Sequence, residues 1–228
     1  MLDWPTIDTV LLDMDGTVLD LHFDNHFWLD YLPRRYAEIH GHRERDARAE
    51  LHQRFGSLRG QLSWYCLDFW SAQLQLDIVA LKREVQHLIA VRPDAPPFLE
   101  ALRHSGRQLW LVTNAHRASL ELKLELTDIG LHFDRLISSH DFQAPKESPE
   151  FWAGLQRAHP FDPGRALMVD DTPSVLQAAR QYGIGQQLYM RQPDHRHPPR
   201  PPHADLPGVV IFDELLPALL ELVEPCHD

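Results

Sequence analysis

Cysteine is scarce in this sequence, with two residues, Cys66 and Cys226, among 228. They lie far apart and form no CxxC pair, which excludes a disulfide framework and a zinc site built from paired cysteines. We interpret Cys66 as a buried thiol and Cys226 as a thiol in the C-terminal tail.

The sequence contains fifteen histidines, but their spacing does not indicate a metal site. Two groups stand out: His195, His197 and His203 in a proline-rich stretch, and His40 and His42 on either side of a glycine. Neither group has a second set of ligands at a regular spacing, and both occur in polar sequence. We therefore expect these histidines at the surface, without a bound transition metal.

Long hydrophobic runs and basic charge are also missing. No window reaches the roughly 18 apolar residues of a membrane helix, and the N-terminus has no basic stretch before an apolar one. The formal net charge is −11 and the pI about 5.7, so the surface repels nucleic acid and anionic lipid. These absences predict a soluble cytoplasmic protein with neither nucleic acid nor a membrane as its partner. An anionic substrate would need a local positive centre, such as a bound cation.

Short apolar runs alternate with longer amphipathic stretches along most of the chain, as strands alternate with helices. Near-continuous apolar strands are typical of a parallel sheet that helices cover on both faces. We expect an α/β fold with a doubly wound, Rossmann-like sheet, and Asp94 as the cap of its first covering helix. The expected strands are 9–12, 108–112, 135–138, 166–169, 187–190 and 208–212, and the helices are 95–104, 118–127, one from Pro149, and one from Pro173 to Gly183.

Residues 19–91 differ from the rest because they contain no good strand run. They are rich in aromatic residues, and apolar residues recur near their end at helical spacing. We expect an inserted α-helical cap domain at 19–91, between two parts of the α/β core at 1–18 and 92–228. The stretch 193–207, rich in proline and histidine, is expected to be a surface loop.

Reactive polar residues follow three of the expected strands directly. Ligands of open α/β sheets bind beyond the carboxyl ends of the strands, so these residues should meet at one edge. A single aspartate pair could be a turn or a helix cap, but three such strand ends and a lysine before a helix favour a functional site. The residues are Asp13, Asp15, Thr113, Asn114, Lys146, Asp170 and Asp171.

The order of these motifs resembles the haloacid dehalogenase superfamily of phosphohydrolases. That family has an apolar strand followed by DxDGT, a strand ending in Ser or Thr, a lysine before a helix, and a strand ending in an acidic pair. The corresponding residues are 10–17, Thr113, Lys146, Asp170 and Asp171. The resemblance implies a doubly wound sheet with a helical cap after the first motif.

A Mg²⁺ cofactor is implied as well. A carboxylate about 4 Å from a single negative charge is repelled by about 4 kcal/mol at an effective dielectric near 20, and a phosphate dianion doubles this. A hard divalent cation with oxygen ligands offsets the repulsion. By resemblance, Asp13 and Asp171 bind the cation directly, Asp170 binds it through water, and Asp15 binds it through its backbone carbonyl.

The resemblance further assigns the chemical steps. Asp13 is expected to be the nucleophile that forms an aspartyl phosphate, and Asp15 the acid and then the base. Thr113, Asn114 and Lys146 are expected to hold the phosphoryl oxygens. Members that cleave carbon–halogen bonds lack the acid/base aspartate, so Asp15 favours a phosphomonoesterase.

Several stretches resemble the bacterial GMP/IMP 5′-nucleotidase subgroup, which implies a purine nucleoside monophosphate as substrate. Trp64, Tyr65, Phe23 and Asn25 are candidates to contact the leaving group, although most aromatic rings of the cap are expected in its core. The alternatives are another small phosphate ester such as phosphoglycolate or a sugar phosphate, a phosphomutase, and a non-catalytic phosphate-binding module. The matching stretches are residues 8–17, 19–21, 23–25, 27–28, 64–68 with Trp70, 97–102 and 113–116.

Overall fold

A six-stranded parallel sheet forms the centre of the molecule in the computed structural model, which describes residues 2–222. The strand order is β3-β2-β1-β4-β5-β6. The chain builds outward from β1 to β3, returns to β4 beside β1, and builds outward to β6, which confirms the doubly wound sheet. The strands are β1 (Thr9–Leu12), β2 (Gln108–Thr113), β3 (Arg135–Ser138), β4 (Ala166–Asp170), β5 (Gln186–Met190) and β6 (Gly208–Val209).

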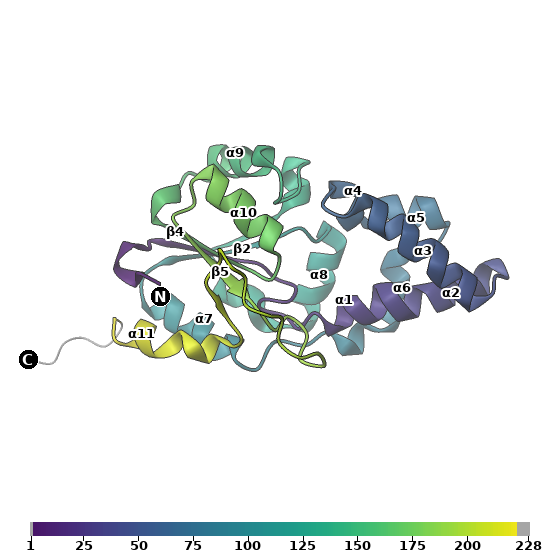
Figure 1. Cartoon of the computed structure of the whole chain (residues 1–228), viewed down its shortest axis with the longest axis horizontal. Helices are drawn as coiled ribbons and strands as arrows, with labels where there is room; N and C mark the ends of the chain where they lie inside the picture. Colours follow the sequence, from purple (N-terminus) through teal and green to yellow (C-terminus); the bar gives the residue numbers. More distant parts are fainter. Residues whose placement is uncertain (1, 223–228) are drawn as a thin grey trace, which may run out of the picture.

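Helices cover both faces of this sheet (Figure 1). Within β1, Val10 and Leu12 point into one apolar cluster and Leu11 into the other, because successive side chains of a strand alternate between faces. The first cluster includes residues of α7, α8 and α11, and the second includes residues of α9 and α10. The helices are α7 (Ala95–His104), α8 (Arg117–Leu126), α9 (Pro149–Ala158), α10 (Pro173–Tyr182) and α11 (Leu216–Leu220).

Local sequence signals mark the start of α9 and the end of α10. The Ser148 hydroxyl accepts the Glu150 N–H at the start of α9, and Gly183 ends α10 with a left-handed φ of 113°. The expectation that Asp94 caps α7 is wrong. Its carboxylate accepts instead from the backbone N–H of Phe212 at 2.6 Å, a tertiary contact that joins the start of α7 to the C-terminal segment.

Six of the seven α-helices between β1 and β2 form the cap, which projects from one end of the sheet in Figure 1. Their aromatic and aliphatic side chains form a third apolar cluster, and Leu122 of α8 joins it from the core. A π-helical segment at Phe27–Tyr31 connects α1 to α2. The helices are α1 (His22–His26), α2 (Leu32–His40), α3 (Glu44–Leu58), α4 (Leu62–Tyr65), α5 (Leu67–Leu74) and α6 (Ile78–Glu84).

The two connections between core and cap run side by side. Leu19 and Val91 form an antiparallel bridge, and the Asp20 N–H donates to the Ala90 carbonyl at 2.9 Å. The division at 18/19 and 91/92 stays a prediction. Among residues 2–222, no helix combines the length and the apolar character needed to cross a bilayer.

The proline- and histidine-rich stretch 193–207 is more than a surface loop. The Pro193 carbonyl accepts from the Leu21 N–H, and the Asp194 carboxylate accepts from the Asn25 amide, both at 2.8 Å. Arg200 reaches the carboxylate of Asp171 at 3.2 Å. The stretch therefore connects the core to the cap and borders the strand ends described next.

Candidate active site

The carboxyl ends of β1 and β4 bring three carboxylates together. Asp13 follows β1 and donates its backbone N–H to Val169 at 3.0 Å, which aligns it with Asp170 and Asp171 at the end of β4. Oxygens of the three side chains lie within 4.8 Å of one another, and all three residues are buried. The parallel pairing of β1 with β4 thus gathers residues more than 150 positions apart in the sequence.

Lys146 holds two of these carboxylates from the loop before α9. Its ammonium pairs with Asp13 and with Asp170, the latter at 2.8 Å, and also donates to the Val112 carbonyl at 2.9 Å. The residue is 2% exposed, so the ammonium is almost fully desolvated. The two carboxylates outweigh that desolvation and raise the pKa of Lys146, which keeps it charged.

Negative charge exceeds positive charge in this cluster. Burial, and then the neighbouring Asp170, raise the pKa of Asp171 to about 7 even though Arg200 opposes the shift. Burial likewise raises the pKa of Asp13 well above its ordinary value, against the attraction of Lys146. Such shifts mark a site where one further positive charge would be strongly stabilised.

Asp13, Asp170 and Asp171 fit the requirements of a hard divalent cation. Their donors are all oxygens, which Mg²⁺ prefers, and they converge from three residues on adjacent strand ends. The carboxylate of Asp15 does not belong to this group and pairs instead with Lys123 of α8. Of the four residues that the sequence predicted around a metal, three have side-chain oxygens close together: Asp13, Asp170 and Asp171. The fourth, Asp15, was expected to bind through its backbone carbonyl.

Asn114 and Thr113 organise the loop at the end of β2. The Asn114 side chain accepts the Lys146 N–H at 2.8 Å and donates to the Glu147 carboxylate at 2.9 Å. The Thr113 hydroxyl accepts the Ala115 N–H at 3.0 Å. From the cap, the Tyr65 hydroxyl donates to Glu147 at 2.7 Å, so the same carboxylate contacts both parts of the molecule. Phosphate binding by Thr113, Asn114 and Lys146 stays a prediction.

A chain of buried ion pairs extends from Asp15 into the cap. The Lys123 ammonium, from α8, contacts Asp15 and Asp24 at 2.6 Å each, and Lys82 contacts Asp24 at 2.7 Å. Burial alone would raise the pKa of Asp24, but the two ammonium groups override it and hold that pKa below its ordinary value. Burial raises the pKa of Asp15, and Lys123 limits the increase.

Sequence reasoning missed Lys123, Asp24, Lys82 and Arg200. Both lysines are 1% exposed, yet in sequence they occur in ordinary amphipathic helices that do not distinguish them from surface residues. One signal was available, since Asp24 stands in the stretch that matches the nucleotidase subgroup. No local pattern identifies Arg200 within the proline-rich stretch.

Gly16 allows the close approach of the acidic residues. Its φ of 84° lies in the left-handed region, and an added Cβ would lie 2.9 Å from Cγ of Asp171 and 2.8 Å from Cβ of Pro193. Glycine is therefore needed both for the backbone conformation and for space. The turn that follows β1 in the DMDGT segment consequently places Asp171 directly against the backbone.

Most of the cap residues singled out as possible substrate contacts are already engaged. Phe23 is 1% exposed and lies under the ammonium groups of Lys82 and Lys123, so a base cannot stack on it in this conformation. Trp64 packs edge-to-face against other cap aromatic rings. Asn25 binds the loop residue Asp194, as described above. Tyr65 is the candidate whose hydroxyl contacts Glu147, the residue next to Lys146.

The sequence and the structure of this chain are similar to those of several known proteins. A family model described as haloacid dehalogenase-like hydrolase matches residues 7–183. The chain is 44% identical over 191 residues to the GMP/IMP nucleotidase YrfG of Escherichia coli, covering 84% of this chain and 86% of that protein. A HAD phosphatase from Thermococcus onnurineus superposes with a TM-score of 0.78 at 26% identity, covering 93% of this chain and 98% of the other. A HAD-superfamily hydrolase from Geobacter sulfurreducens shares the fold, with a TM-score of 0.60 at 18% identity and coverage of 94% and 97%.

Proposed function

The chain belongs to the haloacid dehalogenase-like hydrolases, an enzyme family, and we propose that it is a Mg²⁺-dependent purine nucleoside 5′-monophosphatase. The observation that carries the proposal is the placement of two aspartates with different surroundings on one turn. Asp13 faces Lys146 and the carboxylates of β4, whereas Asp15 faces Lys123. One can serve as nucleophile while the other holds or releases a proton.

The reaction begins with attack of an Asp13 oxygen on phosphorus. The new bond forms as the ester P–O bond breaks, and Asp15 gives its proton to the leaving oxygen. Water then attacks the aspartyl phosphate, Asp15 takes a proton from it, and inorganic phosphate leaves as Asp13 regains its carboxylate. Lys146 holds Asp13 in position and neutralises part of the charge. When bound between Asp13, Asp170 and Asp171, Mg²⁺ would supply the positive charge that lets a carboxylate meet a phosphate dianion.

The raised pKa of Asp15 supports its role as the acid. A carboxylic acid must carry a proton near neutral pH to protonate a leaving oxygen, and burial raises this pKa. Lys123 restrains the shift, so the same group can also accept a proton in the second half of the reaction. We therefore propose that Asp15 gives the proton in the first half of the cycle and takes one in the second.

The preference for GMP and IMP is proposed from the relative. The E. coli protein named GMP/IMP nucleotidase is similar over most of both chains. Cap residues border the candidate active site through Tyr65 and Asp24, so the cap is suited to select the leaving group. We propose a small phosphorylated substrate and a cytoplasmic setting on the same grounds.

A substrate panel tests the proposal directly. Phosphate release would be measured with Mg²⁺ for GMP, IMP, AMP, pyrimidine 5′-monophosphates, phosphoglycolate and a sugar phosphate. We expect kcat/KM to be highest for GMP and IMP, and EDTA to abolish turnover. A higher kcat/KM for phosphoglycolate or the sugar phosphate would refute the nucleotidase assignment while leaving the phosphatase intact.

The Asp13→Asn variant tests the chemistry separately from the substrate. The amide has nearly the same shape but is not a nucleophile, so turnover should fall below a few per cent while the fold is retained. Retained turnover in a folded variant would contradict the role of Asp13. The release of phosphate from an aryl phosphate would be measured for the native protein and for the Asp13→Asn variant.

A further inference from the structure

A second cluster of metal-binding side chains lies apart from the carboxylates of the active site. We propose that Cys66, His116 and His140 form a binding site for a thiophilic divalent transition metal of the Zn²⁺ type, which joins the cap to the core. The site would be separate from the Mg²⁺ site and would have a different preference for metals. It does not depend on the identity of the substrate.

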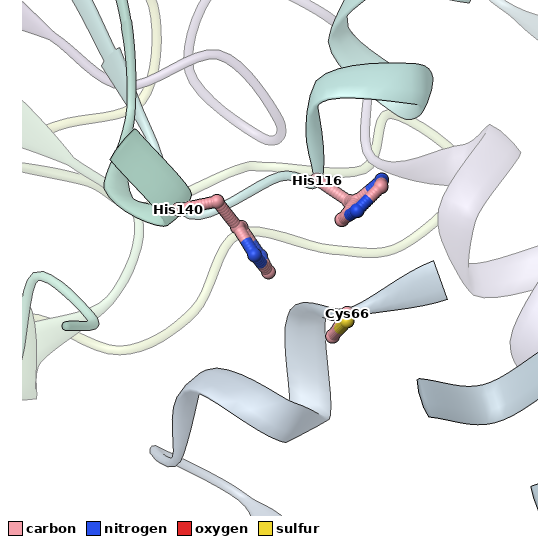
Figure 2. Close-up of side chains that lie close together, drawn as sticks. All are labelled: Cys66, His116 and His140. Atoms are coloured by element: carbon pink, nitrogen blue, oxygen red, sulfur yellow. The ribbon is translucent and has the colours of Figure 1, made fainter. Parts of the chain in front are cut away.

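The three side chains come from three separate elements. Cys66 lies between α4 and α5 of the cap, His116 precedes α8, and His140 lies in the 3-10 turn Ser139–Phe142 after β3. Figure 2 shows the three side chains close together, with His116 and His140 on core segments and Cys66 on the facing cap segment. One potential ligand atom from each side chain lies within 4.8 Å of the other two.

The donor atoms are available to an ion. The Nε2 atom of His140 is buried and makes no hydrogen bond, which is costly unless a partner occupies the space beside it. The rings of His116 and His140 are 4.9 Å apart and nearly perpendicular, at 80°, so they do not stack face to face. Cys66 Sγ accepts the Phe69 N–H at 3.4 Å, and a thiolate has further lone pairs for a metal.

Asp68 can complete a set of four ligands. Its carboxylate lies 3.5 Å from His116 Nε2, and its side chain is 82% exposed and free to rotate. His116 Nδ1 accepts the Ala118 N–H at 3.3 Å. Both contacts of the His116 ring are long, so a metal at either nitrogen would compete with a weak interaction only.

The distances require a small closing movement. Zn–S bonds of about 2.3 Å and Zn–N bonds of about 2.0–2.1 Å place tetrahedral ligand atoms about 3.3–3.6 Å apart. Side-chain rotations that bring the atoms about 1 Å nearer to one another would therefore close the site, since the present separations are 4.8 Å or less. Sulfur and imidazole donors favour Zn²⁺, Co²⁺ or Cu over Mg²⁺, which prefers the oxygens of the other cluster.

Metal binding here would stabilise the packing of the cap against the core. Cys66 belongs to the cap and both histidines to the core, so one ion would cross-link segments that are 50 and 74 residues apart from Cys66 in the sequence. A ligand that binds the folded state alone raises its stability according to its concentration and affinity. The melting temperature of the Mg²⁺-saturated enzyme should therefore rise when Zn²⁺ is added.

Cobalt substitution gives a direct readout of sulfur ligation. The Cys226→Ser protein, in which Cys66 is the remaining cysteine, would be saturated with Mg²⁺ and titrated with Co²⁺ while its absorption spectrum is recorded. We expect one Co²⁺ per chain, a sulfur-to-cobalt charge-transfer band in the near ultraviolet, and visible bands of tetrahedral intensity. Zn²⁺ should then displace the Co²⁺ and remove these bands.

Two variants assign the ligands. Cys66→Ser keeps an oxygen that can accept the Phe69 N–H but removes the sulfur, so the charge-transfer band should disappear while the melting temperature without added metal stays close to that of the parent. His140→Gln should weaken Co²⁺ binding by roughly 100-fold or more. His203→Gln, in the stretch 193–207, is the matched control and should bind Co²⁺ like the parent.

The cobalt experiments can either establish the metal site or overturn it. A stoichiometric, Cys66-dependent Co²⁺ spectrum that His140→Gln weakens and His203→Gln leaves intact would establish the site. No cobalt binding in the Mg²⁺-saturated parent, or an unchanged spectrum in a folded Cys66→Ser protein, would overturn the proposal. Neither result depends on phosphatase activity, so the proposed function is tested independently.

Discussion

Replacing Asp171 by asparagine should stabilise the metal-free protein at alkaline pH and leave it nearly unchanged at acidic pH. Burial and the nearby Asp170 raise the pKa of Asp171 to about 7, from an ordinary value of 3.8. Asparagine has almost the same shape, and it carries no charge at any pH. The variant therefore removes an electrostatic penalty that the native protein carries whenever no cation is bound.

The size of the effect follows from the difference in pKa between folded and unfolded chains. The folded state binds more protons between pH values of about 4 and 7, so stability is present at low pH and is lost as the pH rises through that window. Each pKa unit corresponds to about 1.4 kcal/mol, which gives a loss of up to about 4 kcal/mol by pH 8. The Asp171→Asn chain should lack most of this loss.

Chemical denaturation in EDTA at pH 4 and pH 8 provides the measurement. We expect the unfolding free energies of the two proteins to be close at pH 4, near the ordinary pKa of an aspartate, and the variant to be the more stable at pH 8. Adding Mg²⁺ at pH 8 should stabilise the native protein and have much less effect on the variant. Asp205→Asn, which removes an exposed carboxylate of the proline-rich stretch, is the matched control and should follow the native protein.

Equal pH dependence for the native and Asp171→Asn proteins would refute this reasoning. It would mean that Asp171 is solvated or paired well enough to stay ionised without a cation, contrary to its 7% exposure and its position beside Asp170. The case for a cation among Asp13, Asp170 and Asp171 would then lose its electrostatic support.

Three further substitutions test the surroundings of the acid/base residue. Lys123→Met should cost about 3–5 kcal/mol of stability in denaturant titrations and shift the pH profile of kcat upward, because Asp15 loses the ammonium that lowers its pKa. Lys82→Met should cost stability because Asp15 and Asp24 would then share the single ammonium of Lys123, yet it should shift the kcat profile less, since Lys82 contacts Asp24 and not Asp15; equal shifts for the two variants would contradict this expectation. Gly16→Ala should lower both melting temperature and kcat, because its Cβ would collide with the Asp171 side chain; native-like values for both would show that the turn can relax.

Local signals in the sequence predicted most of the core. The strand run at 9–12 and the DMDGT segment indicate both a buried parallel strand and reactive groups at its end, because strand period and turn chemistry depend on neighbouring residues. Five of the six expected strands lie within one residue of their observed bounds at each end, whereas β6 is shorter, at Gly208–Val209. The Asp94 side chain does not cap its helix, because it accepts a hydrogen bond from Phe212 in the C-terminal segment. This contact depends on tertiary packing and not on local sequence.

The partners of the reactive residues required the tertiary structure. Lys123 stands 108 positions from Asp15, and nothing in its helix distinguishes it from a solvated lysine until the cap is packed against α8. The histidines that attract notice in the sequence, in the proline-rich stretch and beside Gly41, are not those that gather near Cys66. Cys66 itself is only partly buried, contrary to the sequence interpretation, and Cys226 lies outside the described residues.

By itself, the sequence determined the α/β core, the helical insertion and the acidic strand ends, because apolar periodicity and a motif of five adjacent residues are local properties. Only the tertiary structure decided which of the other side chains meet: Lys146 with Asp170, Lys123 with Asp15, and Cys66 with two histidines. The physical reason is that Coulomb and ligand interactions depend on distance in space, and long-range folding brings together residues that no spacing in the chain relates.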